Sequence, residues 1–227
     1  MTITGISSMA TRLVLAELAA TYTRQTGQAV AIESVGGVDA AKRVQAGEAF
    51  DMVLLAADAI DKLIASGHAM AGSRVDLVQS PVALAVRAGA PQPDVASESA
   101  VRQAVLAARS ISFSTGPSGV YLTKLFERWG IAQAIAPRLV QAPPGVPVGT
   151  LVARGDVELG FQQLSELMNL DGITVLGTLP AEIACITTFS GAVCTTTSQA
   201  QAVRALLAFM ASSETADAKR RHGMQPA

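Results

Sequence analysis

Short apolar runs alternate with longer helix-like segments along the first third of the chain. The strand-like runs, each with the helical pattern that follows it, are 2–6 and 9–25, 29–35 and 38–47, and 51–56 and 58–66. This alternation is typical of a parallel sheet covered by helices. The sequence therefore predicts an α/β fold.

A second stretch repeats the same pattern further along the chain. Its expected strands and helices are RSISFSTG (109–116), 118–129, RLVQA (138–142), 147–154 and VELGFQQL (157–164). Two long apolar runs, 75–89 and 182–196, lie before and after this stretch and could cross between two lobes as hinge strands. The chain would then end in helices at 198–211 and 213–222. Taken alone, the pattern is equally compatible with a single doubly wound domain.

Composition narrows the classes of partner. The 227 residues are 50% hydrophobic and carry a net charge of −1, so the chain should fold compactly and offers no basic surface for nucleic acid. No apolar run approaches the roughly 20 residues that span a bilayer. We expect a protein that does not cross a membrane.

Small and polar residues follow the expected strands, where ligands of open α/β sheets bind. Ser7 and Ser8 follow the first strand, Gly36, Gly37 and Val38 the second, and TGPSGVY (115–121) follows SISFS. Any one of these turns could serve only as a helix cap, but three on one sheet edge favour an anion site at helix N-termini. None has the spacing of a nucleotide-binding glycine loop.

Residues for covalent or metal catalysis are scarce. The histidines, His68 and His222, are both expected near helix ends, which disfavours a catalytic triad. Asp51 and Asp58 flank the third strand and are interpreted as structural. Cys185 and Cys194 could face each other, although two small buried thiols are the favoured interpretation. Neither a metal nor a cofactor is expected.

Four segments resemble a known family in order and spacing. GISSMATRLVLAELAATYTRQTG (5–27), VQAGEAFDMVLLA (44–56), PSGVYLTKLFERWG (117–130) and VARGDVELGF (152–161) are similar to the molybdate-binding type of periplasmic solute-binding protein. The resemblance implies a two-lobed type II periplasmic-binding-protein fold, each lobe a mixed sheet flanked by helices, joined by two hinge strands. We expect lobe 1 to be 1–80 plus 190–227, lobe 2 to be 81–189, and a ligand in the interlobe cleft.

The resemblance also assigns binding positions. The family's first ligand serine falls on Ser8, beside Ser7, and the small residue of its second-lobe turn falls on Ser118, before Gly119 and Tyr121. The loop that supplies a backbone contact falls on Gly145 and Val146.

Two departures from the family argue against molybdate. Gly36, Gly37 and Val38 stand where molybdate binders have a serine-rich loop, and Gln162 and Gln163 stand near the place of a tyrosine. These changes widen the site and add an amide that donates and accepts, which suits a larger carboxylate. Arg12, Lys42 and Arg43 are the nearest candidate cations, with exposed helix faces as the alternative.

Two functions remain open at this stage. One is capture of a small anion, an organic di- or tricarboxylate in preference to molybdate, for the membrane component of an ABC importer. The other is a cofactor-free isomerase similar to aconitate isomerase, with Glu33 or Asp39 as the base and Tyr121 as a possible acid. We expect a periplasmic location if a leader was removed before Met1, and a cytoplasmic one otherwise.

Overall fold

The computed structural model describes residues 1–143 and 146–227, which form two compact units. Unit 1 consists of Met1–Ser80 and Thr188–Ala227, and unit 2 of Pro81–Thr187. Two strands belong to both units: β4 (Val75–Arg87) leaves unit 1, and β8 (Ile186–Val193) returns to it.

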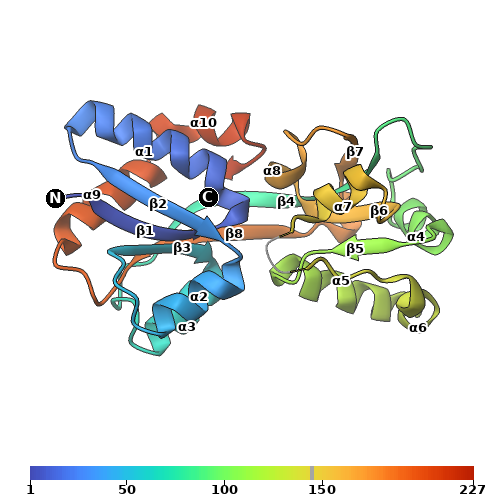
Figure 1. The fold of residues 1–227 in the computed structure, drawn as a ribbon, viewed down its shortest axis with the longest axis horizontal. Coiled ribbons are helices and arrows are strands. Elements are labelled where there is room, and N and C mark those ends of the chain that lie inside the picture. The colour runs from blue at the N-terminus through green and yellow to red at the C-terminus, as the bar shows by residue number, and fades with distance from the viewer. Residues whose placement is uncertain (144–145) are drawn as a thin grey trace. The chain divides into compact units, whose positions relative to one another are not determined.

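Unit 1 is built on a mixed sheet with helices on both sides (Figure 1). Its other elements are β1 (Ile3–Ser8), η1 (Met9–Thr11), α1 (Arg12–Thr26), β2 (Val30–Val35), α2 (Gly37–Gln45), β3 (Met52–Ala56), α3 (Ala57–Ala65), α9 (Ala200–Ala211), η4 (Ser213–Thr215), α10 (Ala216–Arg221) and β9 (Gln225–Pro226). Strand β1 lies between β2 and β3 and is parallel to both, whereas β8 is antiparallel to β3. The predicted alternation of strands and helices is thus found in the three parallel strands β2, β1 and β3. The fourth strand, β8, is antiparallel to them.

Strand β3 shows why this part of the sequence is continuously apolar. All five of its residues are buried. Met52 and Leu54 pack with α1 and α9, while Val53 and Leu55 pack with α2 and α3 on the opposite face. Because successive strand side chains point to opposite faces, a sheet covered on both sides needs apolar residues at every position.

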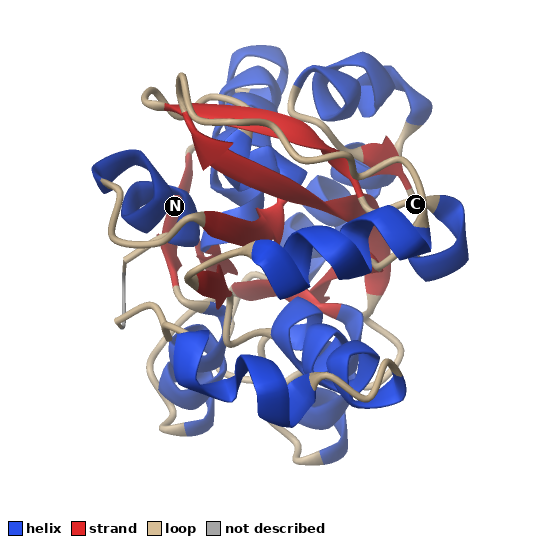
Figure 2. Ribbon diagram, turned by 90° about the vertical axis from the view of Figure 1, so that its right-hand side faces the viewer, coloured by secondary structure: helices blue, strands red, loops and turns tan. Residues whose placement is uncertain are grey.

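Unit 2 repeats the arrangement with a smaller sheet. Its elements are α4 (Glu98–Ala107), β5 (Ile111–Phe113), α5 (Pro117–Arg128), α6 (Ala132–Ile135), η2 (Ala136–Arg138), α7 (Val148–Arg154), β6 (Leu159–Gln163), α8 (Leu164–Leu167), β7 (Ile173–Thr178) and η3 (Ala181–Ile183). Strand β5 is parallel to β6, and both β6 and β7 are antiparallel to β4. Figure 2 shows the strands from a second direction, with helices on either side of them.

The core of unit 2 follows the alternation of β4. Val82, Leu84 and Val86 pack against α4 and α5, whereas Ala83 and Ala85 face Leu167 of α8. Large side chains on one face and alanines on the other let α8 approach the sheet closely.

One predicted strand is wrong. RLVQA (138–142) forms no strand in the structure: Arg138 ends η2, and Leu139 makes only an isolated bridge to Ile111. Pro137 and Pro143 flank the segment, and proline cannot donate to a strand ladder, so the extended stretch stays short. Unit 2 also contains elements that the sequence pattern did not indicate, the longest of which are α4 and β7.

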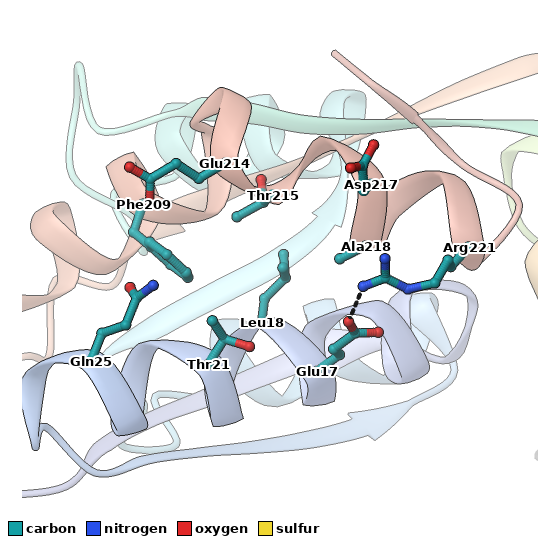
Figure 3. A pocket seen from close by; sticks show the side chains of 10 residues that line it. All are labelled: Glu17, Leu18, Thr21, Gln25, Phe209, Glu214, Thr215, Asp217, Ala218 and Arg221. Carbon is teal, nitrogen blue, oxygen red and sulfur yellow. Dashed lines mark hydrogen bonds and ion pairs between the residues drawn. The ribbon is translucent and has the colours of Figure 1, made fainter.

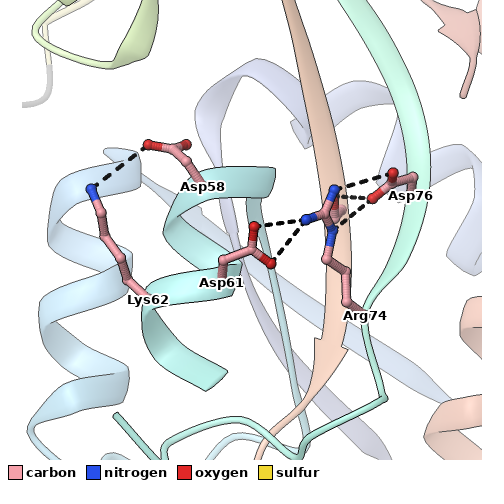
Figure 4. Close-up of polar contacts among 6 residues, drawn as sticks. Asp58, Asp61, Lys62, Arg74 and Asp76 are labelled. Atoms are coloured by element: carbon pink, nitrogen blue, oxygen red, sulfur yellow. Dashed lines mark hydrogen bonds and ion pairs between the residues drawn. The ribbon is translucent and has the colours of Figure 1, made fainter. Parts of the chain in front are cut away.

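Ion pairs on the surface of unit 1 join α3 to the start of β4 (Figure 4). Arg74 donates to Asp61 and to Asp76, and Asp76 also accepts a bond from Ser190 of β8 at 2.6 Å. Asp58 and Lys62 form a separate, exposed pair one helical turn apart. Arg74 thus joins α3 to β4, and Asp76 extends the link to β8, whereas Asp58 pairs only within its own helix.

Asp51, just before β3, binds both β1 and the loop that leads into α9. Its carboxylate accepts hydrogen bonds from the backbone and hydroxyl of Thr4, from Thr197 and from Gln199. Burial, the largest single effect, raises the pKa of Asp51, but these bonds together hold it below its ordinary value. The structural interpretation of Asp51 therefore rests on four donors from two segments, the strand at Thr4 and the loop at 197–199.

We expect Asp51→Ala to lower the free energy of unfolding by about 2 to 4 kcal/mol at neutral pH, because it leaves buried donors without an acceptor. Since the folded pKa is lowered, this contribution is present above about pH 4 and is lost as pH falls through the folded pKa. Urea unfolding between pH 3 and pH 7 measures it.

Asp58→Ala is the matched control, because Asp58 flanks the same strand but makes only an exposed pair with Lys62. It should cost less than about 1 kcal/mol. Equal losses for the two variants, or a loss at Asp51 that does not shrink with falling pH, would contradict the role given to Asp51.

Candidate functional site: hydroxyl pairs at the strand ends

The carboxyl ends of β1 and β2 bring two serines together in unit 1. The parallel register places Ser7 opposite Ser34, and their hydroxyl oxygens lie 2.7 Å apart. Ser7 is fully buried. Each hydroxyl can donate only one proton, so a hydrogen-bonded pair leaves one proton to donate to a ligand or to a carbonyl.

Ser8 lies at the mouth of the first helix, as predicted for a cap. Its side-chain oxygen accepts the N–H of Ala10 at 3.3 Å, and its carbonyl accepts the hydroxyl of Thr11 at 3.0 Å. A hydroxyl that accepts from the backbone still has its own proton to donate. Ser8 can therefore cap the turn and bind an anion at the same time.

The glycine turn after β2 lies against Ser8. A Cβ atom placed on Gly37 would be 3.8 Å from the side chain of Ser8, and one on Gly36 would be 3.2 Å from a carboxylate oxygen of Asp39. Val38, in the first turn of α2, is 50% exposed. The structure thus brings Ser7, Ser8 and Gly37 together, with an apolar side chain beside them.

The predicted base Glu33 is held by Arg43. Both carboxylate oxygens accept from this guanidinium, at 2.6 and 3.0 Å, and Arg43 also pairs with Glu48 and lies over the ring of Phe50. The hydrogen bond from Arg43 lowers the pKa of Glu33. A carboxylate of lowered pKa accepts protons poorly, so this pairing disfavours Glu33 as a base.

The remaining charged candidates of unit 1 lie on its surface. Asp39 and Lys42 are exposed on α2. Arg12 begins α1 and is also exposed; it lines a hollow of about 500 Å³ between α1 and β2, together with Ser34. Among the three predicted cations, Arg12 thus shares a hollow with Ser34, one member of the serine pair.

Unit 2 carries a second hydroxyl pair, again after a parallel strand. Ser114 follows β5, and its oxygen lies 2.7 Å from that of Ser118 in the first turn of α5. Ser118 is 3% exposed. A Cβ atom on Gly119 would be 1.7 Å from the carbonyl oxygen of Ser114, so only glycine allows α5 to start this close to the strand.

Tyr121 is bound within unit 2. Its hydroxyl donates to the carbonyl of Ile183 at 3.1 Å. Burial is the largest cause of a raised pKa at Tyr121. The hydroxyl proton is already donated to a carbonyl, and the raised pKa makes it a weaker acid. Both effects disfavour Tyr121 as the catalytic acid.

The glutamines at the end of β6 are buried and hydrogen-bonded inside unit 2. Gln162 accepts the N–H of Gly149 at 3.0 Å and donates to Glu166 at 2.8 Å, whereas Gln163 donates to Thr187 at 2.9 Å. Val146 donates its N–H to the carbonyl of Pro143. The predicted position Gly145 lies outside the described residues.

Sequence reasoning missed three polar residues of these strand ends: Ser34, Ser114 and Glu166. Ser34 and Ser114 each pair with a serine that was predicted. The expected pairing of the first two strands contained the signal for Ser34. Parallel strands of similar length end side by side, so a serine near the end of the second strand lies beside one near the end of the first.

A separate hollow of about 210 Å³ lies on unit 1 between α1, α9 and α10 (Figure 3). Its charged lining comprises Glu17, Glu214 and Asp217 against one arginine, Arg221, which is bound to Glu17. The excess of carboxylates would repel an anion. We therefore do not assign the anion site to it.

Within residues 1–143 and 146–227, no cluster of three or more histidine, cysteine, aspartate or glutamate side chains could hold a metal ion. The same part of the chain contains no helix with the length and hydropathy needed to cross a membrane. Cys185 and Cys194 are free and buried.

Comparison with known proteins identifies the class. The model of the family described as bacterial extracellular solute-binding protein matches residues 3–225, and the chain belongs to this family. The resemblance drawn from the sequence is confirmed. So is the two-lobed α/β fold of periplasmic binding proteins, which the solved structures below share.

The relatives include an enzyme and two anion-binding proteins. An aconitate isomerase from Pseudomonas sp is 39% identical over 99% of this chain and 88% of its own length. The periplasmic molybdate-binding protein of Azotobacter vinelandii has a TM-score of 0.80 at 20% identity, covering 98% of both chains. A sulfate-binding protein from Mycobacterium tuberculosis H37Rv has a TM-score of 0.81 at 15% identity, covering 100% of this chain and 87% of its own.

We expect Gly119→Ala to destabilise the protein by about 3 kcal/mol or more, because the new methyl group would overlap a backbone oxygen and push α5 from β5. Gly116→Ala, three residues earlier, is the control: a Cβ there meets nothing within 4 Å. That variant should cost no more than about 1 kcal/mol. Thermal unfolding compares them, and equal melting temperatures would contradict the close approach.

Proposed function

We propose that this protein is a cofactor-free isomerase that binds a small unsaturated polycarboxylate of the aconitate class and moves a proton within it. The observation that carries the proposal is the 39% identity to an aconitate isomerase along 99% of this chain. A relationship of this extent makes the same class of ligand and reaction the first hypothesis to test.

The strand-end residues support an organic anion as the ligand. Ser8 can donate its hydroxyl proton, and the pairs Ser7–Ser34 and Ser114–Ser118 can each donate one more. Such donors suit carboxylate oxygens, and they also stabilise the enolate-like charge that forms when a proton leaves the carbon next to a carboxylate.

Exposed valines beside these donors favour a ligand with a carbon skeleton. Val38 adjoins Gly37 and is 50% exposed, and Val120 adjoins Gly119 and is 55% exposed. An inorganic oxyanion gains nothing from an apolar neighbour, whereas a polycarboxylate has carbon atoms to cover. This argument favours carboxylates over molybdate or sulfate.

Family membership favours a second function, in which the protein captures a small anion and delivers it unchanged. In that case the partner is the membrane component of an ABC importer, and the working location is the periplasm. The two functions share the ligand-binding residues and differ in whether a C–H bond of the ligand breaks.

Proton NMR in deuterated water separates the two functions. We expect the purified protein to convert trans-aconitate into its cis isomer, because removal of a proton from the methylene carbon and protonation of the vinyl carbon shift the double bond. Line broadening of aconitate without a new isomer or deuterium uptake would support capture instead. A response to molybdate or sulfate, with none to any carboxylate, would refute the isomerase and the carboxylate ligand, and would leave capture of an inorganic anion.

Loss of a strand-end hydroxyl should weaken ligand binding. We expect Ser8→Ala, Ser34→Ala and Ser118→Ala each to raise the Kd for aconitate about tenfold or more, since a hydrogen bond to a charged group contributes about 1.5 to 3 kcal/mol. Calorimetric titration measures the change. Ser66→Ala is the control, because Ser66 is an exposed serine after α3; equal affinities for all four variants would show that these hydroxyls do not bind the ligand.

A further inference from the structure

A lysine in α10 of unit 1 is fully buried without a partner. Lys219 is 0% exposed, and its Nζ atom has no hydrogen-bond partner within residues 1–143 and 146–227. Lysine is almost never fully buried unless it is paired, because removing an ammonium group from water is costly. The candidate anion site and the proposed reaction make no use of this residue.

The surroundings of Lys219 are apolar. Its neighbour Ala218 and Met224, whose N–H bonds to the carbonyl of Lys219, both belong to the larger apolar core of unit 1. The same core contains Val14 of α1 and Val203 of α9. The amine therefore lies in a region that favours a neutral group over a charged one.

The charged groups around α10 are bound elsewhere or exposed. The elements packed against this helix are α1, η4 and β9, and β9 carries no charged residue. Glu17 of α1 accepts from Arg221 and from His222. The other charged residues of these elements and of α10 are exposed: Arg12, Arg24, Glu214, Asp217 and Arg220. Burial alone lowers the pKa of Lys219, with no contribution from a neighbouring charge.

Residues 216–227, which we call the α10–β9 segment, can open without unfolding the rest of unit 1. The helix has six residues and the strand two, and β9 pairs with β4 at Val78 and Gln79. Short outer elements such as these open at a lower free energy than a whole core. Opening of this segment is therefore the least costly way to bring the amine of Lys219 into water.

We infer that Lys219 makes the opening of the α10–β9 segment sensitive to pH. Closing the segment removes the amine from water and favours its neutral form, whereas opening returns it to water and lets it take up a proton. A fall in pH thus favours the open form. Opening would also separate β9 from β4 and release Glu17 of α1 from Arg221 and His222. The inference does not depend on the proposed function.

The direction of the pKa shift sets the pH range of the effect. The pKa of Lys219 is lowered in the closed segment and has its ordinary value of about 10.4 in the open one. Between these two values the open form holds more protons, so the opening constant rises up to tenfold for each unit by which pH falls. Below the lowered pKa both forms are protonated, and the dependence on pH ends.

Tryptic cleavage after Arg221 measures the opening, because a protease cuts the transiently opened segment. Lys219→Met keeps an unbranched side chain without the amine. We expect this variant to be cut at least about tenfold more slowly than the unchanged protein at pH 7. The difference should shrink as pH rises and vanish near pH 10.5. Free peptides with the sequence 214–227 of each protein correct for the pH dependence of trypsin itself.

Lys62→Met is the matched control, because Lys62 is exposed on α3 and forms a weak pair with Asp58. It should leave cleavage after Arg221 unchanged at every pH. Equal or faster cleavage of Lys219→Met at pH 7 would overturn the inference. So would a difference that does not vary with pH, because the amine would then keep one protonation state when the segment opens.

A second variant protects the test against misfolding. Lys219→Leu also removes the amine and should show the same slower cleavage at pH 7. Melting temperatures establish that each variant is folded. If neither variant folds, the buried position requires the amine, and the inference is wrong.

Discussion

Parallel pairing of neighbouring strands is the constraint on which the candidate site depends. In unit 1, β1 and β2 end side by side, which places Ser7 against Ser34 and Gly37 against Ser8. In unit 2, β5 and β6 do the same for their own polar residues. Because parallel strands share one carboxyl edge, unit 1 joins hydroxyls that lie 27 residues apart, whereas the Ser114–Ser118 pair of unit 2 lies within one turn.

The sequence predicted most of the fold because burial on both faces leaves a strong pattern. The run at β3 is apolar at every position, and the helices around it begin within about two residues of the expected ones. Segments without such a pattern were less predictable. The region around Arg138 resembled a strand but lies between prolines. The helix α4, which Ser97 caps, was not predicted from the sequence pattern.

The sequence indicated which turns form the candidate site, but not which side chains bind one another there. The resemblance located Ser8 and Ser118, because turns after strands are short and keep their spacing. It did not indicate that Arg43 holds Glu33, or that Gln162 holds Glu166, since side-chain hydrogen bonds depend on helix orientation as well as order. The pairing with Arg43 therefore disfavours Glu33 as a base, which the sequence alone did not indicate.

Amide chemical shifts recorded by ¹H–¹⁵N NMR during titration with propane-1,2,3-tricarboxylate test the central claim, that the strand-end turns bind a carboxylate. We predict the largest shifts at Ser8, Gly37 and Gly119, with little change for molybdate at the same concentration. Shifts confined to other surfaces, such as the hollow lined by Glu17 and Arg221, would contradict the account. So would a stronger response of the same turns to molybdate.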